Sequence, residues 1–165
     1  MKHTLSVLVE NQPGVLTRVC GLFARRGYNI ESLAVGETHD PSISCITIVA
    51  GGEDLVIEQV VKQLDKLIDV IEIRDISETE YVDRELMLLK VRAEASRRGE
   101  IMQIVDIFRA RIVDIGQDTL IIECTGDDGK TQAIEKSLKP FGIVELVRTG
   151  KIAMVRGLKY GDGRE

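Results

Sequence analysis

The sequence is poor in the residues that mark disulfide-rich, zinc-binding and base-stacking proteins. It has no tryptophan and only three phenylalanines, three tyrosines and three cysteines in 165 residues. Cys20, Cys45 and Cys124 are odd in number and far apart, so they indicate neither a disulfide framework nor a zinc ligand set. Scattered thiols of this kind are typical of a reducing compartment, and we expect the protein to be cytoplasmic.

An excess of basic charge and long apolar runs are also missing. Lysine and arginine total 22 against 27 acidic residues, which gives a formal net charge of -5 at pH 7. Binding to nucleic acid or to an anionic membrane normally needs a basic surface, and a membrane-spanning helix needs roughly 18 or more apolar residues in a row. We therefore expect neither nucleic acid nor membrane as a partner. The polar, strand-like start does not resemble a signal peptide.

Candidates for catalysis are few. His3 and His39 are the only histidines, and we interpret His3 as an ordinary strand residue. The run Gly129-Lys130-Thr131 resembles the end of a phosphate-binding loop, but the glycine that this motif requires five residues earlier is Cys124. We expect a plain helix start there, no catalytic residue in the chain and no metal site.

The spacing of apolar residues predicts a β-α-β-β-α-β order in the first half of the chain. The expected elements are a strand at 3–10, a helix ending near 27, strands at 28–35 and 43–50, a helix at 57–67 and a strand at 70–76. Right-handed crossovers fold this order into a four-stranded antiparallel sheet with both helices on one face, the ferredoxin-like arrangement. The other face of that sheet needs a separate cover.

The same order returns in the second half. The expected elements are a strand at 86–93, a helix around 101–108, strands at 111–115 and 119–125, a helix at 128–138 and a strand at 143–148. We therefore predict an α+β protein of two tandem ferredoxin-like βαββαβ units. The first domain is expected at 1–77, an acidic linker at 78–83 and the second domain at 84–165.

Two fixed differences in residue number, called offsets, relate matching positions in the two halves of the chain. The first pairs Phe23 with Phe108 and Asn29 with Asp114, and the second pairs Leu64 with Leu138 and Ile73 with Val147. The difference between the offsets corresponds to a shorter hairpin in the second unit.

The segment Asn11-Gln12-Pro13-Gly14-Val15-Leu16 joins the first predicted strand to the first helix. Pro13 lacks an N–H, Gly14 has no Cβ, and the first-turn N–H groups lie at the positive end of the helix dipole. A carboxylate or phosphate fits such a corner. The alternative is an ordinary helix start capped by Asn11 or a neighbour. The first offset aligns Asn11 with Ser96, Pro13 with Arg98 and Val15 with Glu100. The second unit therefore lacks this loop.

Two other uses of the fold do not suit these residues. RNA binding on an open sheet uses aromatic side chains of the central strands, and residues 43–50 contain none. A soft-metal chaperone needs paired thiolates in the first loop, and residues 11–16 contain no cysteine. Small-molecule sensing remains.

The loop at 11–16, followed by Tyr28-Asn29-Ile30 at the second strand, resembles an amino-acid-binding ACT domain. The runs at 3–11, 25–33 and 59–67, together with Arg84-Glu85-Leu86, are similar to the small regulatory subunit of acetolactate synthase. The resemblance extends over essentially the whole chain.

The resemblance implies a non-catalytic subunit. It would bind the large catalytic subunit, raise its activity and make it sensitive to the end product valine. That enzyme joins two pyruvates, or pyruvate and 2-oxobutyrate, with loss of carbon dioxide in valine, leucine and isoleucine biosynthesis. Thiamine diphosphate, Mg and FAD would belong to the large subunit, and no cofactor is expected in this chain.

The resemblance also implies a valine site shared by two ACT domains of a homodimer. One chain would supply the loop residues, and its partner would supply the start of the second strand. The expected residues are Asn11, Pro13, Gly14, Val15, Leu16, Asn29 and Ile30. The alternatives are a stand-alone ACT-type sensor that regulates another metabolic enzyme, and an enzyme of ferredoxin-like fold.

Overall fold

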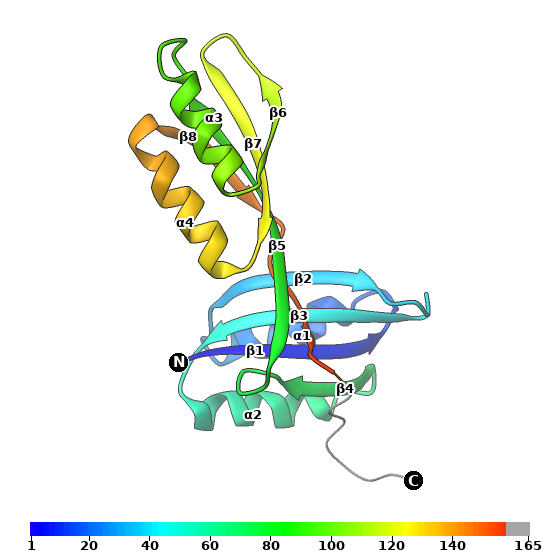
Figure 1. The fold of residues 1–165 in the computed structure, drawn as a ribbon. Coiled ribbons are helices and arrows are strands. Elements are labelled where there is room, and N and C mark those ends of the chain that lie inside the picture. Colours follow the sequence, from blue (N-terminus) through cyan, green and yellow to red (C-terminus); the bar gives the residue numbers. More distant parts are fainter. Residues whose placement is uncertain (158–165) are drawn as a thin grey trace. The chain divides into compact units, whose positions relative to one another are not determined.

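The computed structural model describes residues 1–157, which form two units (Figure 1). The N-terminal unit contains residues 1–82 together with 151–157, and the C-terminal unit contains residues 83–150. Both are sheets covered by helices, so the predicted α+β class with two βαββαβ units is confirmed. None of the helices within residues 1–157 is long and apolar enough to cross a membrane.

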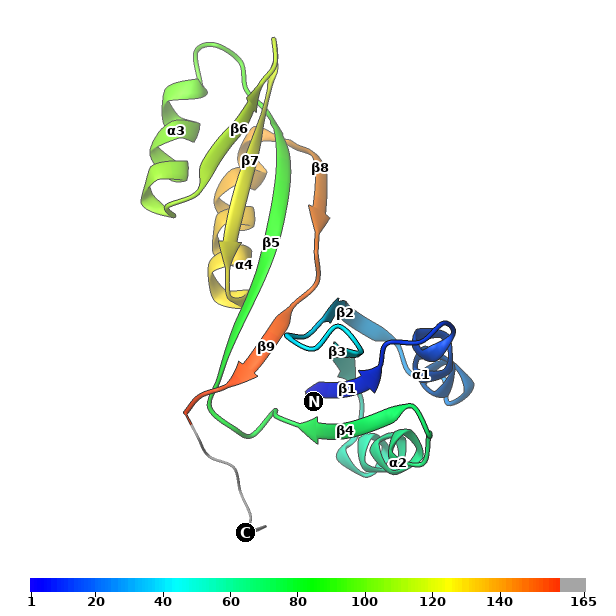
Figure 2. The same cartoon turned by 90° about the vertical axis from the view of Figure 1, so that its right-hand side faces the viewer.

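The N-terminal unit is a four-stranded antiparallel sheet in the order β2-β3-β1-β4. Its elements are β1 Lys2–Glu10, α1 Val15–Arg25, β2 Ile30–Glu37, β3 Ile43–Gly51, α2 Asp54–Asp65 and β4 Val70–Asp75. Alternate residues of β1 and β3 pack with the apolar stripes of α1 and α2 in a single core that includes Leu5, Ile46, Phe23 and Leu64. Figure 2 shows both helices on the same side of this sheet.

Two later segments cover part of the opposite face of this sheet. The fully buried Ile76 donates its N–H to the Thr4 carbonyl at 2.9 Å, and the Lys151 N–H donates to the Ser32 hydroxyl oxygen at 2.8 Å. As a result, Thr47 and Val49 are buried although they point away from the helices. Part of the expected second cover therefore comes from the N-terminal unit's own later residues, Ile76 and Lys151.

The C-terminal unit repeats the topology in the order β6-β7-β5-β8. Its elements are β5 Tyr81–Arg92, α3 Arg98–Ile107, β6 Arg111–Ile115, β7 Thr119–Gly126, α4 Asp128–Leu138, a 3-10 turn at Lys139–Phe141 and β8 Ile143–Arg148. Leu89, Ile101, Ile122 and Ile134 are fully buried in its core.

The unit boundaries differ from the expected ones in two places. Residues 78–83 were expected to form a linker, but β5 already begins at Tyr81. Residues 151–157 were expected in the second domain, but they cluster with the N-terminal unit and contain a further strand, β9 Ile152–Val155, which pairs with β5. Backbone hydrogen bonding explains the change, because the Arg156 N–H donates to the Glu80 carbonyl at 2.8 Å.

The pairing registers also correct part of the predicted repeat. Leu8 and Lys90 are the last residues before the register shift of their central strands, and the residues that precede them, Val7 and Leu89, pair with Ile73 and Leu146. Ile73 therefore matches Leu146, not Val147. Four residues follow each helix before the outer strand, and the match changes by one residue because Leu138 is the last residue of α4 whereas Leu64 is the last but one of α2. Asn29 and Asp114 do not match either, since Asn29 precedes β2 and Asp114 lies within β6.

Candidate functional site

The corner between β1 and α1 is built on a left-handed glycine. Gly14 is the N-cap of α1 with φ 84° and ψ -8°, and no side chain caps the helix. A Cβ on Gly14 would be strained by this φ and would lie 3.3 Å from Arg18 Nη1. The first turn of α1 thus begins with N–H groups that no side chain satisfies, at the positive end of the helix dipole.

Asn11 is not the cap that one of the two interpretations expected. Its side-chain amide donates to the Pro41 carbonyl at 3.0 Å and to Glu37 Oε1 at 3.3 Å, and its backbone N–H donates to the Ser42 carbonyl at 2.8 Å. These contacts fasten the corner to the β2–β3 hairpin. The Asn11 nitrogen is therefore occupied, whereas its Oδ1 forms no hydrogen bond within the described chain.

The charges on α1 itself suit an anion at the corner, while the carboxylates of Asp69, Glu37 and Glu10 lie nearby on other elements. The first turn of α1 contains no acidic residue, and Arg18 lies one turn into the helix. Arg18 forms an ion pair with Asp69, and the Asp69 carbonyl accepts from the Glu10 N–H at 2.8 Å. The guanidinium is thereby held beside Gly14.

The predicted loop residues lie together, but they are not equivalent. Asn11, Pro13, Gly14 and Leu16 are exposed at the corner, whereas Val15 is buried in the core. The Val15 N–H already donates to the Gln12 carbonyl, at a long 3.4 Å. Only exposed backbone of this turn is therefore available to a ligand, and the Val15 side chain is not.

Asn29 and Ile30 lie at the opposite end of the same sheet. Ile30 pairs with Ala50, which pairs with His3 at the start of β1, whereas the corner follows Glu10 at the end of β1. This separation along the strands is roughly 20 Å. One chain therefore does not bring these two residues to its own corner, and a site that contains both sets requires two chains.

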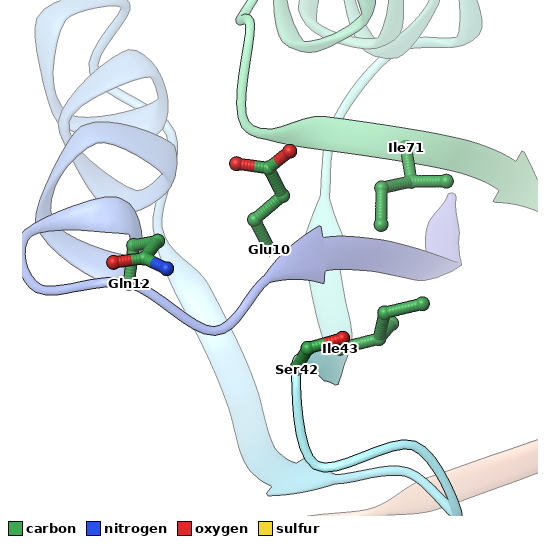
Figure 3. A pocket seen from close by; sticks show the side chains of 5 residues that line it. All are labelled: Glu10, Gln12, Ser42, Ile43 and Ile71. Carbon is green, nitrogen blue, oxygen red and sulfur yellow. The ribbon is translucent and has the colours of Figure 1, made fainter.

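A shallow hollow of about 370 Å³ adjoins the corner and was not predicted from the sequence (Figure 3). It is lined by Glu10, Gln12, Ser42, Ile43 and Ile71. Figure 3 shows the Ile43 and Ile71 side chains on one side of Glu10 and the Gln12 side chain on the other, near α1. No sequence motif signals this hollow, because its residues come from three strand ends that meet only in the folded sheet.

His3 has acidic partners that its sequence neighbours do not reveal. Its Nδ1 lies 2.8 Å from Asp75 Oδ2 and its Nε2 lies 3.1 Å from Asp54 Oδ1. Burial raises the pKa of the Asp75 carboxyl, but hydrogen bonds from Ser77 and His3 outweigh it, so the pKa is below the ordinary value of 3.8. Both ring nitrogens are occupied, so the buried His3 ties β1 to β4 and α2 and has no free nitrogen to act as a base.

The start of α4 is an ordinary capped helix. Asp127 is its N-cap, and its carboxylate accepts from the Lys130 N–H at 2.9 Å. A carboxylate already occupies the position that a bound phosphate would take. The interpretation of Gly129-Lys130-Thr131 as a helix start is confirmed.

The C-terminal unit closes the corner that the N-terminal unit leaves open. The Arg98 guanidinium donates to the carbonyls of Ala93 at 3.0 Å, Gly116 at 2.7 Å and Gln117 at 2.6 Å. Glu100 places an acid in the first turn of α3. The Arg98 side chain therefore fills this corner and ties it to its own hairpin, and Glu100 pairs with Arg97 at 3.9 Å.

Comparison with known proteins identifies relatives over nearly the whole chain. Residues 5–72 match the family model described as AHAS small subunit-like ACT domain, and residues 84–157 match the one described as small subunit of acetolactate synthase. The chain is 57% identical to the probable acetolactate synthase small subunit of Archaeoglobus fulgidus over 159 residues, which is 96% of this chain and 99% of that protein.

Two further relatives agree with this match. The chain is 54% identical to the probable acetolactate synthase small subunit of Methanothermobacter thermautotrophicus, over 94% of this chain and 93% of that one. The crystal structure of the acetolactate synthase small subunit from Thermotoga maritima superimposes with a TM-score of 0.85 at 42% identity, over 95% of this chain and 98% of that one.

Proposed function

The chain belongs to the family of acetolactate synthase small subunits, and from this membership we propose how it regulates the enzyme. It binds the large catalytic subunit, raises its activity and makes it sensitive to valine. The observation that carries the proposal is the uncapped, acid-free first turn of α1 within the ACT-like residues 5–72. Branched-chain amino acid biosynthesis is the setting in which this regulation operates.

In this proposal the corner holds the carboxylate of valine. The exposed N–H groups after Gly14 donate to it, and the Arg18 guanidinium adds positive charge beside them. The ammonium group needs oxygen acceptors. Asn11 Oδ1 is suited to that role because the Asn11 nitrogen is held by the hairpin.

The partner chain completes the proposed site. Asn29 and Ile30 lie about 20 Å along the strands from the corner of their own chain, so we assign them to the corner of a second copy. The Asn29 amide would bind a polar group of valine, and Ile30 would contact its side chain. An apolar contact of this kind discriminates one methylene by only about 1–3 kcal/mol, so leucine and isoleucine should bind more weakly instead of being excluded.

A shared site accounts for control of the large subunit. Valine bound between two chains stabilises the dimer geometry for which it has the higher affinity. The equilibrium between the two geometries shifts by the ratio of the two affinities. The large subunit would respond to that geometry. Thiamine diphosphate, Mg and FAD would remain on the large subunit, which would perform the chemistry.

The first test is calorimetric titration of the purified chain with valine, with leucine and a non-branched amino acid for comparison. Saturable binding of about one valine per chain is expected from a twofold arrangement with two equivalent sites. A folded dimer that gives no heat with any of these amino acids, alone or with the large subunit present, would contradict the proposal.

Mixing two defective variants tests whether the site spans two chains. Gly14→Asp damages only the corner, and Asn29→Ala damages only the part given to the partner. A dimer with one copy of each variant has one site with both defects and one site with neither. We expect a refolded mixture to contain sites of wild-type valine affinity, which neither variant has alone. If the mixture binds no better than the variants do separately, the site lies within one chain.

A further inference from the structure

The outer edge of the C-terminal sheet is apolar and unpaired within the described chain. β6 is the edge strand in the order β6-β7-β5-β8, and Figure 1 shows no strand beyond it. Val113 and Ile115 on this strand are 51% and 71% exposed, and Ile107 at the end of the neighbouring α3 is 76% exposed. A free strand edge flanked by exposed large apolar side chains is a template for pairing with another strand.

The charges of β6 are arranged to complement a second copy of the same strand. Arg111 pairs with Glu123 and Asp114 with Ile121, two residues apart on β7, so a register shift brings both side chains to the same face. Neither side chain forms an ion pair within residues 1–157. In an antiparallel pair related by a twofold axis, Arg111 of one copy lies opposite Asp114 of the other, and the contact occurs twice.

The other edge of this sheet, β8, also exposes two apolar side chains, Val144 at 52% and Val147 at 56%, but its charged side chains are paired within the unit. On β8, Glu145 already lies 3.6 Å from Lys90, and Arg148 already pairs with Glu85 at 2.9 Å. Its charges are balanced inside the unit. The comparison therefore favours β6 as the edge that meets a second copy.

We propose that the β6 strands of two copies of this chain pair antiparallel, with Arg111 opposite Asp114, and join their C-terminal sheets into one. This interface is separate from any contact between the ACT domains, and it does not depend on valine binding. Val113, Ile115 and Ile107 of the two copies would lose contact with water in it.

A charge-reversal mixture of the full-length chain tests the proposal. In an assembly of Arg111→Asp chains, Asp lies opposite Asp at both contacts, and in one of Asp114→Arg chains, Arg lies opposite Arg. In the mixed assembly both contacts pair Asp with Arg. Native mass spectrometry of a mixture with one variant labelled with ¹⁵N should therefore show mixed assemblies in excess of the statistical ratio by about tenfold, the size expected when two like-charge contacts become two opposite-charge pairs.

Two controls make the outcome decisive. Labelled and unlabelled wild-type chains should mix statistically. The same is expected for a mixture of Glu94→Arg with Lys136→Asp, because these substitutions reverse exposed charges elsewhere in the same unit. The preference should also fall in 0.5 M salt, because exposed charges are screened. Statistical mixing of the β6 variants, with circular dichroism showing both folded, would overturn the proposal.

The same samples separate this proposal from the proposed function. Valine titration of each β6 variant should match the wild type, because both substitutions lie outside the N-terminal unit. A wild-type chain that fails to bind valine would count against the effector site alone. The mixing ratio would still decide the strand pairing.

Discussion

The two units share one topology but differ at the corner that follows their central strand. In the N-terminal unit, the corner is a left-handed Gly14 with an uncapped, acid-free first turn. In the C-terminal unit, Arg98 fills the corner with three hydrogen bonds to carbonyls, and Glu100 adds a negative charge. Strand order therefore follows from the apolar pattern, which both units share, whereas the open first turn that we propose as the anion site depends on a few corner residues.

The units also fasten their sheets differently at equivalent positions. In the N-terminal unit, His3 on β1 joins Asp75 on β4 and Asp54 on α2. In the C-terminal unit, the matching pair is Glu85 on β5 and Arg148 on β8, and Arg148 also contacts Glu135 on α4. Each site links a central strand, an outer strand and the second helix, but the basic side chain is on the central strand in one unit and on the outer strand in the other.

The largest effect is expected at Gly14. Gly14→Asp places a carboxylate at the proposed carboxylate site and should abolish valine binding and valine inhibition. The left-handed conformation adds only about 1–2 kcal/mol of strain, so the unit should remain folded. Calorimetry and inhibition assays with the large subunit measure the effect.

Gly99→Asp is the matched control for Gly14→Asp. Gly99 lies in the first turn of α3, has no heavy atom within 4 Å of an added Cβ and does not have a positive φ. The Gly99→Asp variant should bind valine as the wild type does. Retained valine inhibition in Gly14→Asp would contradict the proposed site.

Removal of the Arg98 clamp tests how the second corner is closed. Arg98→Met keeps an unbranched side chain but loses three hydrogen bonds to carbonyls, and it should lower the free energy of unfolding of the C-terminal unit by about 2–3 kcal/mol. Chemical denaturation, monitored by hydrogen exchange of the β5 and β7 amides, measures this free energy of unfolding. An unchanged midpoint would mean that the clamp does not hold this corner, and valine affinity should not change in either case.

A smaller change in affinity is expected at Asn29. Asn29→Ala removes a proposed hydrogen bond to valine and should weaken binding about tenfold. Gln117→Ala, which shortens an exposed amide side chain in the C-terminal unit, provides the comparison. Equal losses in the two variants would show that Asn29 has no special role.

The smallest effect concerns the His3 network and pH. Asp75→Asn should destabilise the N-terminal unit by about 1 kcal/mol at pH 7, because it weakens hydrogen bonds from Ser77 and His3. The folded pKa of Asp75 lies below its ordinary 3.8, so the stabilisation is complete above that value and disappears as the pH falls through the lower folded pKa. Urea denaturation at pH 7 and pH 3 should show the wild-type advantage shrinking. An advantage that grows on acidification would reverse the assigned sign.

Local patterns predicted much of the fold because each unit buries one face of each element. The helix at 128–138 and the strand at 143–148 coincide with α4 and β8. The cover provided by Ile76 and Lys151 could not be predicted, since its partners Thr4 and Ser32 lie on distant strands and its backbone hydrogen bonds leave no periodic signal. Asp54 and Asp75 likewise lie 51 and 72 residues from His3.

The candidate corner was predicted from its sequence, but the atoms that it offers were not. Pro13 and Gly14 indicated a helix start open to an anion, and Gly14 has the left-handed conformation that such a start requires. The role of the Asn11 nitrogen depended on where the β2–β3 hairpin lies, and the burial of Val15 depended on how α1 packs. Both are tertiary facts that a loop motif does not contain.

The return of residues 151–157 to the N-terminal unit has a consequence for synthesis on the ribosome. The first sheet is complete once β4 has emerged, but the N–H of Lys151 that binds Ser32 is made 119 residues after its acceptor. Ribosomes add roughly 5–20 residues per second, so the interval from Val82 to Lys151 lasts roughly 3–14 s. During that time part of the polar face of the sheet lacks its final cover, and the first unit to be made is the last to be finished.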